Sequence, residues 1–450
     1  MEIYVIDEYK ANTSPHFPII GIIPAYHSMI WNIQLYGLGY FEVTVEASAQ
    51  NVSLLQVGRY LCRQSDIEQI GTRTYYNNAM IIRSVTTTYD AELGWLLTAS
   101  GKSTKDIITQ RIIWDRYEAE DRPLTTVAVE LFIRNITNPD GYIQDIIDDL
   151  NDVIDDLYDQ RDAKAQERDD AQEAYDDAVA EYGAGSPEAA AAKETLDTKE
   201  EEYQEILEEL VLKNREMTYW QLDLEAQEKR VIPYIIAGLI DYGFTPPNVT
   251  VQLQGENLGE WMEEICNEYH LGWQMAMSDD SMVLSFDQGT DRTGTVIFSP
   301  EFDNLKNVQY VKSLEAFKNA GLVNGDEYDE GFGPSPVAAD VGTASGQNRY
   351  EMHIDASSLE MEAASSYGNY YNMLLQYGKS EIIKYKKKTS ISGEIDTDGV
   401  FKIGEDFNLG DVATVQTEQK VTASTRLIEI IYADEGSGSS TTGTFEEWED

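Results

Sequence analysis

The sequence predicts an α+β, multidomain protein with two β-barrel-like domains, smaller α/β domains and an inserted antiparallel coiled-coil hairpin. Three observations lead to this prediction. Short segments of β-forming residues fill the first 100 residues, and similar segments return after residue 289. Between them, a long polar stretch carries apolar residues every three or four positions, which is typical of a coiled coil. A chain of 450 residues has room for several domains.

Residues 1–100 are expected to form the first β-barrel-like domain. In YFEVTVE, the side chains of Phe41, Val43 and Val45 would share one face of a strand. The two glycines of the preceding LYGLG would mark a bulge or sharp bend in that strand. Further strands are predicted in MEIYVID, GRYLCRQ, AMIIRSVTTTYD and LGWLLTAS. Short strands at this spacing are typical of a barrel or a sandwich.

Residues 101–135 and 231–288 are expected to form one α/β domain that the coiled coil interrupts. Ser103 or Thr104 would cap a helix through KDIITQRII, and TTVAVELFIRNI would form a second helix. Further along, Asn257 and Glu260 resemble a capping box at the start of an amphipathic helix. The segments LGWQMAM and SMVLSFDQ would follow it as a β-hairpin.

Residues 136–230 contain the coiled-coil pattern. The first seam begins with Ile147, Leu150, Ile154 and Leu157 and then continues through Arg161, Lys164, Arg168, Ala171, Tyr175, Ala178 and Tyr182. A Gly-Ala-Gly sequence interrupts it, and Ser186 and Pro187 restart a helix as N-cap and first helical residue. The second seam contains Ala192, Leu196, Tyr203, Ile206, Leu210, Met217, Trp220 and Leu224. Each arm has about 40 residues, which at ~1.5 Å per residue gives a hairpin roughly 60 Å long.

Residues 289–435 are expected to form the second β-barrel-like domain, with one long helix over 361–386. The loop 326–346 and the segment 436–450, a flexible acidic tail, are rich in Gly, Ser and acidic residues and are expected to be mobile. LQVGRYL (55–61) and FNLGDVATV (407–415) each place a glycine in a turn just before a strand. This similarity is a weak indication of two related β domains.

The charge of the chain limits its partners. There are 33 Lys and Arg against 81 Asp and Glu, which gives a formal net charge of -48. Such a charge repels DNA, RNA and anionic lipid surfaces. We therefore expect no specific nucleic-acid binding, although the chain could line a passage that nucleic acid crosses without adhering.

The two cysteines and the apolar stretches bear on the cellular compartment. Cys62 and Cys266 are expected to be reduced and to act as small hydrophobic residues. The first 25 residues lack a basic start and a long apolar run, which argues against a secretory signal. The longest apolar stretch, near Ile235 to Ile240, falls short of the ~20 residues that span a bilayer. We expect a chain made in a cytoplasm, with no membrane segment.

The sequence predicts no catalytic residues, no cofactor-binding residues and no metal-ligating residues, so the expectation for each of these sites is none. The four histidines are His16, His27, His270 and His353, and none lies in a nucleophile motif. Cys266 and His270 would share a helix face, but no third ligand follows to complete a zinc site. A partly buried apolar helix face is the simpler interpretation.

Two charged segments have competing interpretations. Glu394, Asp396, Asp398, Gly399 and Glu405 match the spacing of a calcium loop, but the flanking segments resemble strands. A β-hairpin with an acidic turn is the preferred interpretation. The basic cluster KYKKK (384–388) ends the predicted long helix, so we expect it to cap that helix and not to bind nucleic acid.

Several stretches together resemble the siphophage tail-hub (baseplate hub) family of long-tailed bacteriophages. The resemblance covers about 1–134 and 231–435 and rests on the order and spacing of its segments. These are MEIYVID, IWNIQLYGLGYFEVTV, LLQVGRYL, ASGKSTKDIITQRII, GENLGEWMEEICNEYHLGW, DRTGTVIFSPEFDNLKN and GEIDTDGVFKIGEDFNLGDVATV. Proteins of this family are similar to the spike-base hub proteins of contractile injection machines.

The resemblance implies a structural, non-enzymatic virion protein of the tail tip, synthesised in the host bacterial cytoplasm. It implies a homotrimer that contacts a distal tail ring protein above and tip or fibre proteins below, and through which DNA passes. Two similar barrels in each of three subunits would present six units to a sixfold ring. No cofactor is implied.

The coiled-coil hairpin departs from the family pattern. It is either a spacer or docking arm or a family-specific insertion without an essential role. Our hypothesis is that it docks a neighbouring protein, and deletion of 142–228 behind a short linker tests this. Normal assembly of the complete tip without those residues would exclude the docking role.

Two other classes of function remain open. The first is a surface-binding adhesin or receptor-binding module of the tail tip, because 28 tyrosines and 7 tryptophans could line sugar-binding sites. Glycan binding by the isolated chain would favour it. The second is a hydrolase, because 81 acidic residues always supply carboxylate pairs. Clearing of cell walls by the purified protein would favour that class.

Overall fold

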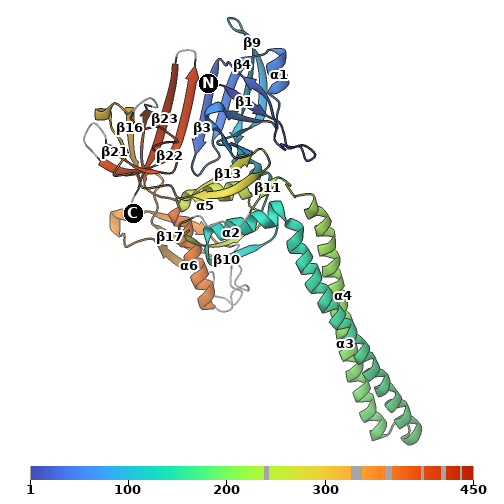
Figure 1. The fold of residues 1–450 in the computed structure, drawn as a ribbon. Helices are drawn as coiled ribbons and strands as arrows, with labels where there is room; N and C mark the ends of the chain where they lie inside the picture. Colours follow the sequence, from blue (N-terminus) through green and yellow to red (C-terminus); the bar gives the residue numbers. More distant parts are fainter. Residues whose placement is uncertain are drawn as a thin grey trace. The chain divides into compact units, whose positions relative to one another are not determined.

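Strands from both ends of the sequence pair into one large sheet in the computed structural model of the protein (Figure 1). The structure describes residues 2–237, 243–325, 337–357, 359, 367–396, 400–416, 422–435 and 438–448. The chain divides into two compact units, one made of Met1–Leu131 and Tyr234–Asp450 and the other of Phe132–Pro233. Each unit is considered separately below.

The large sheet of the first unit has thirteen strands. From the N-terminal part of the chain it takes β1 (Ile3–Ile6), β2 (Ile19–Ile23), β3 (Ser28–Gln34), β4 (Tyr40–Glu46), β5 (Tyr60–Arg63), β8 (Met80–Asp90) and β9 (Gly94–Ser103). From the C-terminal part it takes β15 (Ile297–Phe298), β16 (Leu305–Ser313), β20 (Lys388–Ile395), β21 (Val412–Gln416), β22 (Thr422–Glu435) and β23 (Gly438–Glu447). The strand order is β16-β20-β23-β22-β3-β4-β9-β8-β5-β1-β2, and β21 pairs with both β22 and β15.

Two hydrophobic cores lie against this sheet. The N-terminal core contains the fully buried Trp31 and the predicted inward row Phe41, Val43 and Val45. The alternating glutamates of β4 are exposed, as the period-two pattern requires. The C-terminal core is centred on Phe298, which contacts the rings of Phe407 and Phe445. Each half of the sheet therefore has its own core.

The two halves repeat the same arrangement of five strands. In the N-terminal half the spatial order is β5-β8-β9-β4-β3, and in the C-terminal half it is β21-β22-β23-β20-β16. The order along the chain also agrees, because β3, β4, β5, β8 and β9 correspond in sequence to β16, β20, β21, β22 and β23. All of these pairings are antiparallel. We refer to these sets of strands as repeat 1 and repeat 2.

Local geometry supports the correspondence of the repeats. Gly58 and Gly410, the two glycines of the similar sequence segments, both have φ = 95°, a conformation that favours glycine. The amide of Gly58 donates to the Ile82 carbonyl at 2.9 Å, and that of Gly410 donates to the Leu427 carbonyl at 2.8 Å. A bulge follows Ile82 in β8 and Leu427 in β22. The weak similarity in the sequence therefore marks a real structural repeat.

The repeats join where β22 pairs with β3. The pairing runs from Glu429 opposite Gln34 to Glu435 opposite Ser28. Among the described residues no pairing closes either repeat into a barrel, so the two barrel-like domains remain a prediction. The mixed α and β composition, the several sheets and the long helical hairpin agree with the predicted fold class.

One expectation about this sheet is wrong. The segment 436–450 was expected to be a flexible tail, but Gly438–Glu447 is strand β23, which lies between β20 and β22. The buried Phe445 fixes it, and threonine-rich strands need few large apolar residues when both edges are paired. The glycines of LYGLG lie in the bend between β3 and β4, where Gly39 has φ = 64°. Of the two expected alternatives, the sharp bend is the one that the structure has.

Smaller sheets complete the first unit. One contains β11 (Ile235–Ile236), β14 (Met282–Asp287), β13 (Gly272–Ser278), β7 (Arg73–Tyr76) and β6 (Ile67–Ile70) in that order. Another pairs β10 (Tyr117–Pro123) with β12 (Asn248–Leu253), and a third has the order β18 (Val337–Asp340), β17 (Ala320–Asn324), β19 (Glu351–Asp355). The predicted hairpin of β13 and β14 is confirmed.

Several helices in the described part of the chain accompany these sheets. They are α1 (Ala49–Leu54), η1 (Gln64–Asp66), α2 (Leu124–Phe132), α5 (Leu258–Glu268), η4 (Pro300–Phe302) and α6 (Tyr367–Ile383), with η5 (Gly346–Asn348) as a single 3-10 turn. The predicted α5 is confirmed. The expected helix through 105–113 is instead a short 3-10 helix, η2 (Thr104–Gln110), without a side-chain cap at Ser103. The side chains of its first five residues are buried, and packing overrides the α-helical preference there.

The second unit is the predicted antiparallel helical hairpin. It contains η3 (Ile133–Thr137), α3 (Pro139–Tyr182) and α4 (Pro187–Glu228), and Figure 1 shows the two long helices running side by side. Ile147, Leu150, Ile154 and Leu157 are buried against Leu210 and Met217, which confirms the seam. Ser186 accepts a hydrogen bond from the Ala189 amide at 3.0 Å, as expected of an N-cap.

Charged pairs hold the middle of the hairpin, where the apolar seam is interrupted. Lys164 and Lys199 both contact Glu202, at 2.8 and 3.0 Å, and Lys199 also contacts Glu167 at 2.8 Å. These side chains remain substantially exposed, so each pair adds little stability. Their contribution is to fix how the two helices align along the middle of the hairpin.

The mobile loop expected over 326–346 is only partly within the described residues. Residues 326–336 lie outside them. Val337–Asp340 forms strand β18, which pairs with β17.

Candidate functional site

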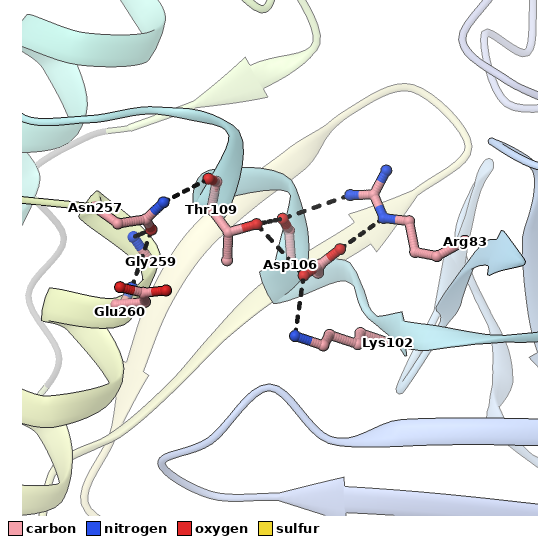
Figure 2. Close-up of polar contacts among 7 residues, drawn as sticks. All are labelled: Arg83, Lys102, Asp106, Thr109, Asn257, Gly259 and Glu260. Atoms are coloured by element: carbon pink, nitrogen blue, oxygen red, sulfur yellow. Dashed lines mark hydrogen bonds and ion pairs between the residues drawn. The ribbon is translucent and has the colours of Figure 1, made fainter.

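The two most distinctive sequence segments, ASGKSTKDIITQRII and GENLGEWMEEICNEYHLGW, meet in the structure. Figure 2 shows the contact between η2 and the start of α5. Asn257 is the N-cap of α5 and accepts hydrogen bonds from the amides of Gly259 at 3.0 Å and Glu260 at 3.2 Å. Its Nδ2 donates to the Thr109 carbonyl at 2.7 Å. One asparagine therefore both starts the helix and connects it to η2. The capping pattern predicted the first of these roles and not the second.

A glycine permits this close approach. A Cβ on Gly259 would lie 2.9 Å from the backbone nitrogen of Thr109 and 2.6 Å from its Cγ2. Beside this contact, the Ile113 amide donates to the Glu256 carbonyl at 2.9 Å and the Gly255 amide donates to the Ile113 carbonyl at 2.7 Å. The two segments thus form a short ladder that ends at the helix cap.

Ion pairs connect η2 to the sheet at the same place (Figure 2). Asp106 accepts from Arg83 Nε at 2.6 Å and lies 3.8 Å from Lys102 Nζ. Arg83 is the extra residue of the bulge in β8. A bulge changes the direction of its side chain, which here points toward η2. Thr109 Oγ1 also donates to the Asp106 carbonyl at 2.8 Å.

Lys105 forms the buried centre of this region. Its side chain is almost inaccessible to solvent. Its Nζ donates to the carbonyls of Gln34, Leu35 and Gly37 at 2.8, 3.0 and 2.9 Å. Burial lowers the pKa of Lys105 to about 7. The three bonds hold the turn between β3 and β4 against η2.

A second polar cluster surrounds His270. Its Nδ1 lies 2.9 Å from Glu446 Oε1 and its Nε2 lies 2.9 Å from Lys386 Nζ. Because an ammonium group can only donate, Nε2 accepts, and Nδ1 carries the proton that it donates to Glu446. Burial raises the pKa of Glu446, but hydrogen bonds from His270 and Tyr36 outweigh burial and hold that pKa below its usual value. The cluster ties the end of α5 to β23.

Two buried arginines also connect segments that are distant in sequence. Arg426 donates to the carbonyls of His270 and Gln288, and its guanidinium lies 3.6 Å from the centre of the Trp448 ring. Arg63 pairs with Asp66 at 2.7 Å and stacks on Tyr432 at 3.7 Å. Tyr432 belongs to repeat 2 and Arg63 to repeat 1. Both arginines therefore use their charge to join parts of the fold.

A cleft of about 940 Å³ lies between the repeats and β13. Its lining includes Arg63, Asp66, Lys105, Trp273 and Tyr432. Arg63 and Lys105 already bond to other parts of the protein, as described above. The arrangement of these groups is suited to holding segments together.

The expectation that Cys266 and His270 share a helix face is wrong, because α5 ends at Glu268, before His270. Cys266 is buried and free, as is Cys62, and burial raises the pKa of both thiols. Both nitrogens of His270 have the partners given above. In the part of the chain that the structure describes, no group of three or more His, Cys, Asp or Glu side chains could hold a metal ion. His16, His27 and His353 lie elsewhere.

The two charged segments differ from their expected structures. Asp398 and Gly399 lie outside the described residues. Glu394 lies in β20 and accepts from Asn307 at 3.0 Å. β20 pairs with β16 and β23 and not with the strand that follows it, so the expected acidic β-hairpin is wrong. The spatial neighbours of β20 come from distant sequence, which local patterns do not reveal.

The lysines of KYKKK follow α6, which ends at Ile383. Lys386 donates to the Glu268 carbonyl, at the end of α5. The cluster therefore helps to cap a different helix from the one expected. Lys384 pairs with Glu381 at 2.9 Å.

Sequence reasoning missed Lys105, Arg63 and Arg426. A cation within an otherwise apolar strand is a signal that was available in YLCRQ and STRLIEII. None of the helices formed by described residues is both long and apolar enough to cross a membrane.

The fold is that of a phage tail protein. The 43 kDa tail protein of prophage MuSo2 from Shewanella oneidensis is similar over 99% of this chain and 98% of its own, with a TM-score of 0.51 and 10% identity. The chain belongs to the family of Siphovirus ReqiPepy6 Gp37-like proteins, whose model matches residues 205–445. The resemblance to siphophage proteins is therefore confirmed.

Two further solved structures are similar at lower TM-scores. A tail protein from Neisseria meningitidis MC58 has a TM-score of 0.47 and 8% identity, over 99% of this chain and 96% of that one. Prophage tail protein gp18 from Listeria monocytogenes EGD-e has a TM-score of 0.43 and 9% identity, over 99% and 94%. No curated protein matches the sequence.

Proposed function

We propose that the protein is the structural tail-hub subunit of a long-tailed bacteriophage. Three copies form a ring at the distal end of the tail tube, link the tube to the tail tip and let DNA pass. The observation that carries this proposal is the internal repeat of five strands within one chain. In this proposal 1–100 forms one hub domain, and 289–435 together with β23 (Gly438–Glu447) forms the other.

The repeat solves a problem of symmetry. A trimer of chains with two equivalent units each presents six similar units around its axis. Such a face matches a sixfold ring protein of the tail above, while the threefold body suits tip or fibre proteins below. A single unrepeated domain in each chain would offer only three contacts to a sixfold ring.

The buried polar groups support a structural role. Lys105, Arg63 and Arg426 each bond to segments that are distant in sequence, and His270 joins α5 to β23. Catalytic groups need a free, poised atom that faces a substrate. Here the contacts of these four side chains stabilise the joints of the fold, so we propose a protein that is not an enzyme.

The charge supports the passage of DNA. A net charge of -48 in each chain would keep DNA from adhering to the inside of a ring. A conduit needs this property because DNA must slide through it without stopping at a binding site.

The mass and symmetry of the purified chain test the proposal. Light scattering should give about 150 kDa, three times 50.7 kDa, and negative-stain images should show threefold rings. A monomer at all concentrations, with no ring in the presence of the other tail-tip proteins, would contradict the hub role.

A further inference from the structure

We propose that the outer half of β8 in one copy pairs, antiparallel, with β16 of the next copy. The pairing between copies would repeat the pairing of β22 with β3, which already joins the two repeats within one chain. This inference rests on the trimeric hub proposed above for its closure into a ring, and it adds the strands and the register of the contact.

The template is the dual pairing of β22. Its first part, Thr422–Arg426, pairs with β21, and its second part, Glu429–Glu435, pairs with β3 of repeat 1. From Thr425 to Glu435, β22 also pairs with β23 along its other edge. One edge of β22 is thus shared between its own repeat and the next one.

β8 is the counterpart of β22 and has only the first of these two partners. Met80 and Ile81 pair with β5, which is the counterpart of β21. From Ser84 to Asp90, its ladder is with β9, and no second strand among the described residues occupies the other edge. The vacant part corresponds to the part of β22 that binds β3.

β16 is the counterpart of β3 and supplies the missing edge. It pairs with β20 as β3 pairs with β4, and it ends the strand order of the large sheet in the described part of the chain. Among the described residues, each chain therefore has two strand edges without a partner: the outer part of β8 and the free edge of β16. Within the chain, the counterparts of these two edges, on β22 and β3, pair with each other. A contact between two different edges continues from copy to copy and can close into a ring.

The internal ladder fixes the register. Ile82 corresponds to Leu427, because both precede the bulge, so Thr87 corresponds to Tyr432. On the other strand, Tyr310 lies opposite Ile391 as Trp31 lies opposite Phe41. Within the chain Tyr432 pairs with Trp31. The contact between copies should therefore place Thr87 opposite Tyr310, with Thr86 opposite Val311 beside it.

The composition of the β8 edge suits strand pairing. Ser84–Tyr89, SVTTTY, has no charged residue and four β-branched residues in a row, whereas the chain as a whole is 25% charged. Long, uncharged, exposed edges of this kind pair readily with other strands. Tyr310 is 46% exposed, while its counterpart Trp31 is fully buried in the core. Pairing would cover the tyrosine as it covers the tryptophan.

A second copy explains these edges better than a different protein does. Both halves of the contact are present in one chain, and each has an internal model of its partner. The two lysines of β16, Lys306 and Lys312, are also favourable next to a chain of charge -48. A foreign strand would have to match an edge whose complement the protein already carries.

Disulfide trapping tests the register. The full chain carrying both Thr87→Cys and Tyr310→Cys should form covalent dimers and trimers on mild oxidation, because directly opposed residues bring their Cβ atoms within disulfide reach. The matched control carries Thr88→Cys with Tyr310→Cys. Its cysteines point to opposite faces of the sheet and should not link. Cys62 and Cys266 are buried and stay in both variants.

The outcomes separate this inference from the hub proposal. Linked trimers only in the first variant would support the register. A protein of about 150 kDa that does not link through these positions, or that links equally in the control, would overturn the pairing and leave the trimeric hub intact. A chain that remains monomeric, alone and with the other tail-tip proteins, would overturn both.

Discussion

At the scale of residues, the protein stabilises its joints with buried Lys and Arg side chains. Lys105 donates to three carbonyls, and Arg426 donates to two segments while it stacks on a tryptophan. A buried cation is costly unless its donors are satisfied. Such residues therefore act only in one arrangement of the chain and help to specify it.

The first prediction concerns the pH dependence of Lys105. Burial lowers its folded-state pKa to about 7, whereas an unfolded lysine titrates near 10.4. Between these values the unfolded state binds a proton that the folded state does not. The free energy of unfolding of the wild type, relative to Lys105→Met, should therefore rise by about 1 kcal/mol per pH unit between pH 7 and 9.

Urea unfolding at several pH values measures this difference. Lys102→Met is the matched control, because the Lys102 side chain is 51% exposed, and its difference from the wild type should stay constant over the same range. A constant difference for Lys105→Met as well would contradict the prediction.

The second prediction concerns the close approach at Gly259. In Gly259→Ala the new Cβ would meet the backbone of Thr109 at 2.9 Å. The start of α5 must then move away from η2, which should lower the free energy of unfolding by about 1–3 kcal/mol. Gly294→Ala is the control, since no atom lies within 4 Å of its new Cβ. Equal stability of the two variants would show that the contact is not tight.

At the scale of elements, the helical hairpin depends on its short apolar seam. Leu210 is buried between the helices, while Leu212, two residues away, is 61% exposed. Leu210→Ala removes buried contacts and should destabilise the hairpin by about 2–5 kcal/mol. Leu212→Ala should change its stability by no more than about 0.5 kcal/mol.

Hydrogen exchange of the α3 and α4 amides distinguishes these two variants in the full chain. Faster exchange in Leu210→Ala alone would confirm the seam. Equal exchange in both variants would indicate that the charged pairs hold the hairpin together instead.

The strands show how much an element depends on its neighbours. β23 is rich in threonine, serine and glycine, and its sequence resembles a flexible tail. It is nevertheless paired along both edges, by β20 and β22. Its composition lacks large apolar side chains. The main-chain hydrogen bonds on both edges and the buried ring of Phe445 stabilise it instead.

At the scale of the whole molecule, the net charge limits which partners the protein can bind. The net charge of -48 predicts that the chain does not bind duplex DNA even at low ionic strength, where unlike charges attract most strongly. Fluorescence anisotropy of a labelled duplex should remain unchanged on addition of the protein. Measurable binding that falls as salt rises would reveal a local basic surface and count against a non-adhesive passage.

The sequence by itself determined the elements whose signals are local. The spacing of Ile147, Leu150 and Ile154 predicts the helix face that is buried in the hairpin, and Ser186 with Pro187 predicts the start of the second helix. Asn257 capped α5 as expected because a side chain and an amide three residues away need no distant partner. The charge of the chain also follows from composition alone.

Only the tertiary structure decided which distant segments meet. The repeat is faint in the sequence because strand order is a property of hydrogen bonds between segments hundreds of residues apart, such as β3 and β22. Lys105 looks like an ordinary surface cation until the carbonyls that accept its bonds are brought around it. Local patterns specify elements because neighbouring residues supply the energy, whereas pairing and burial of charge depend on contacts that exist only once the chain has folded.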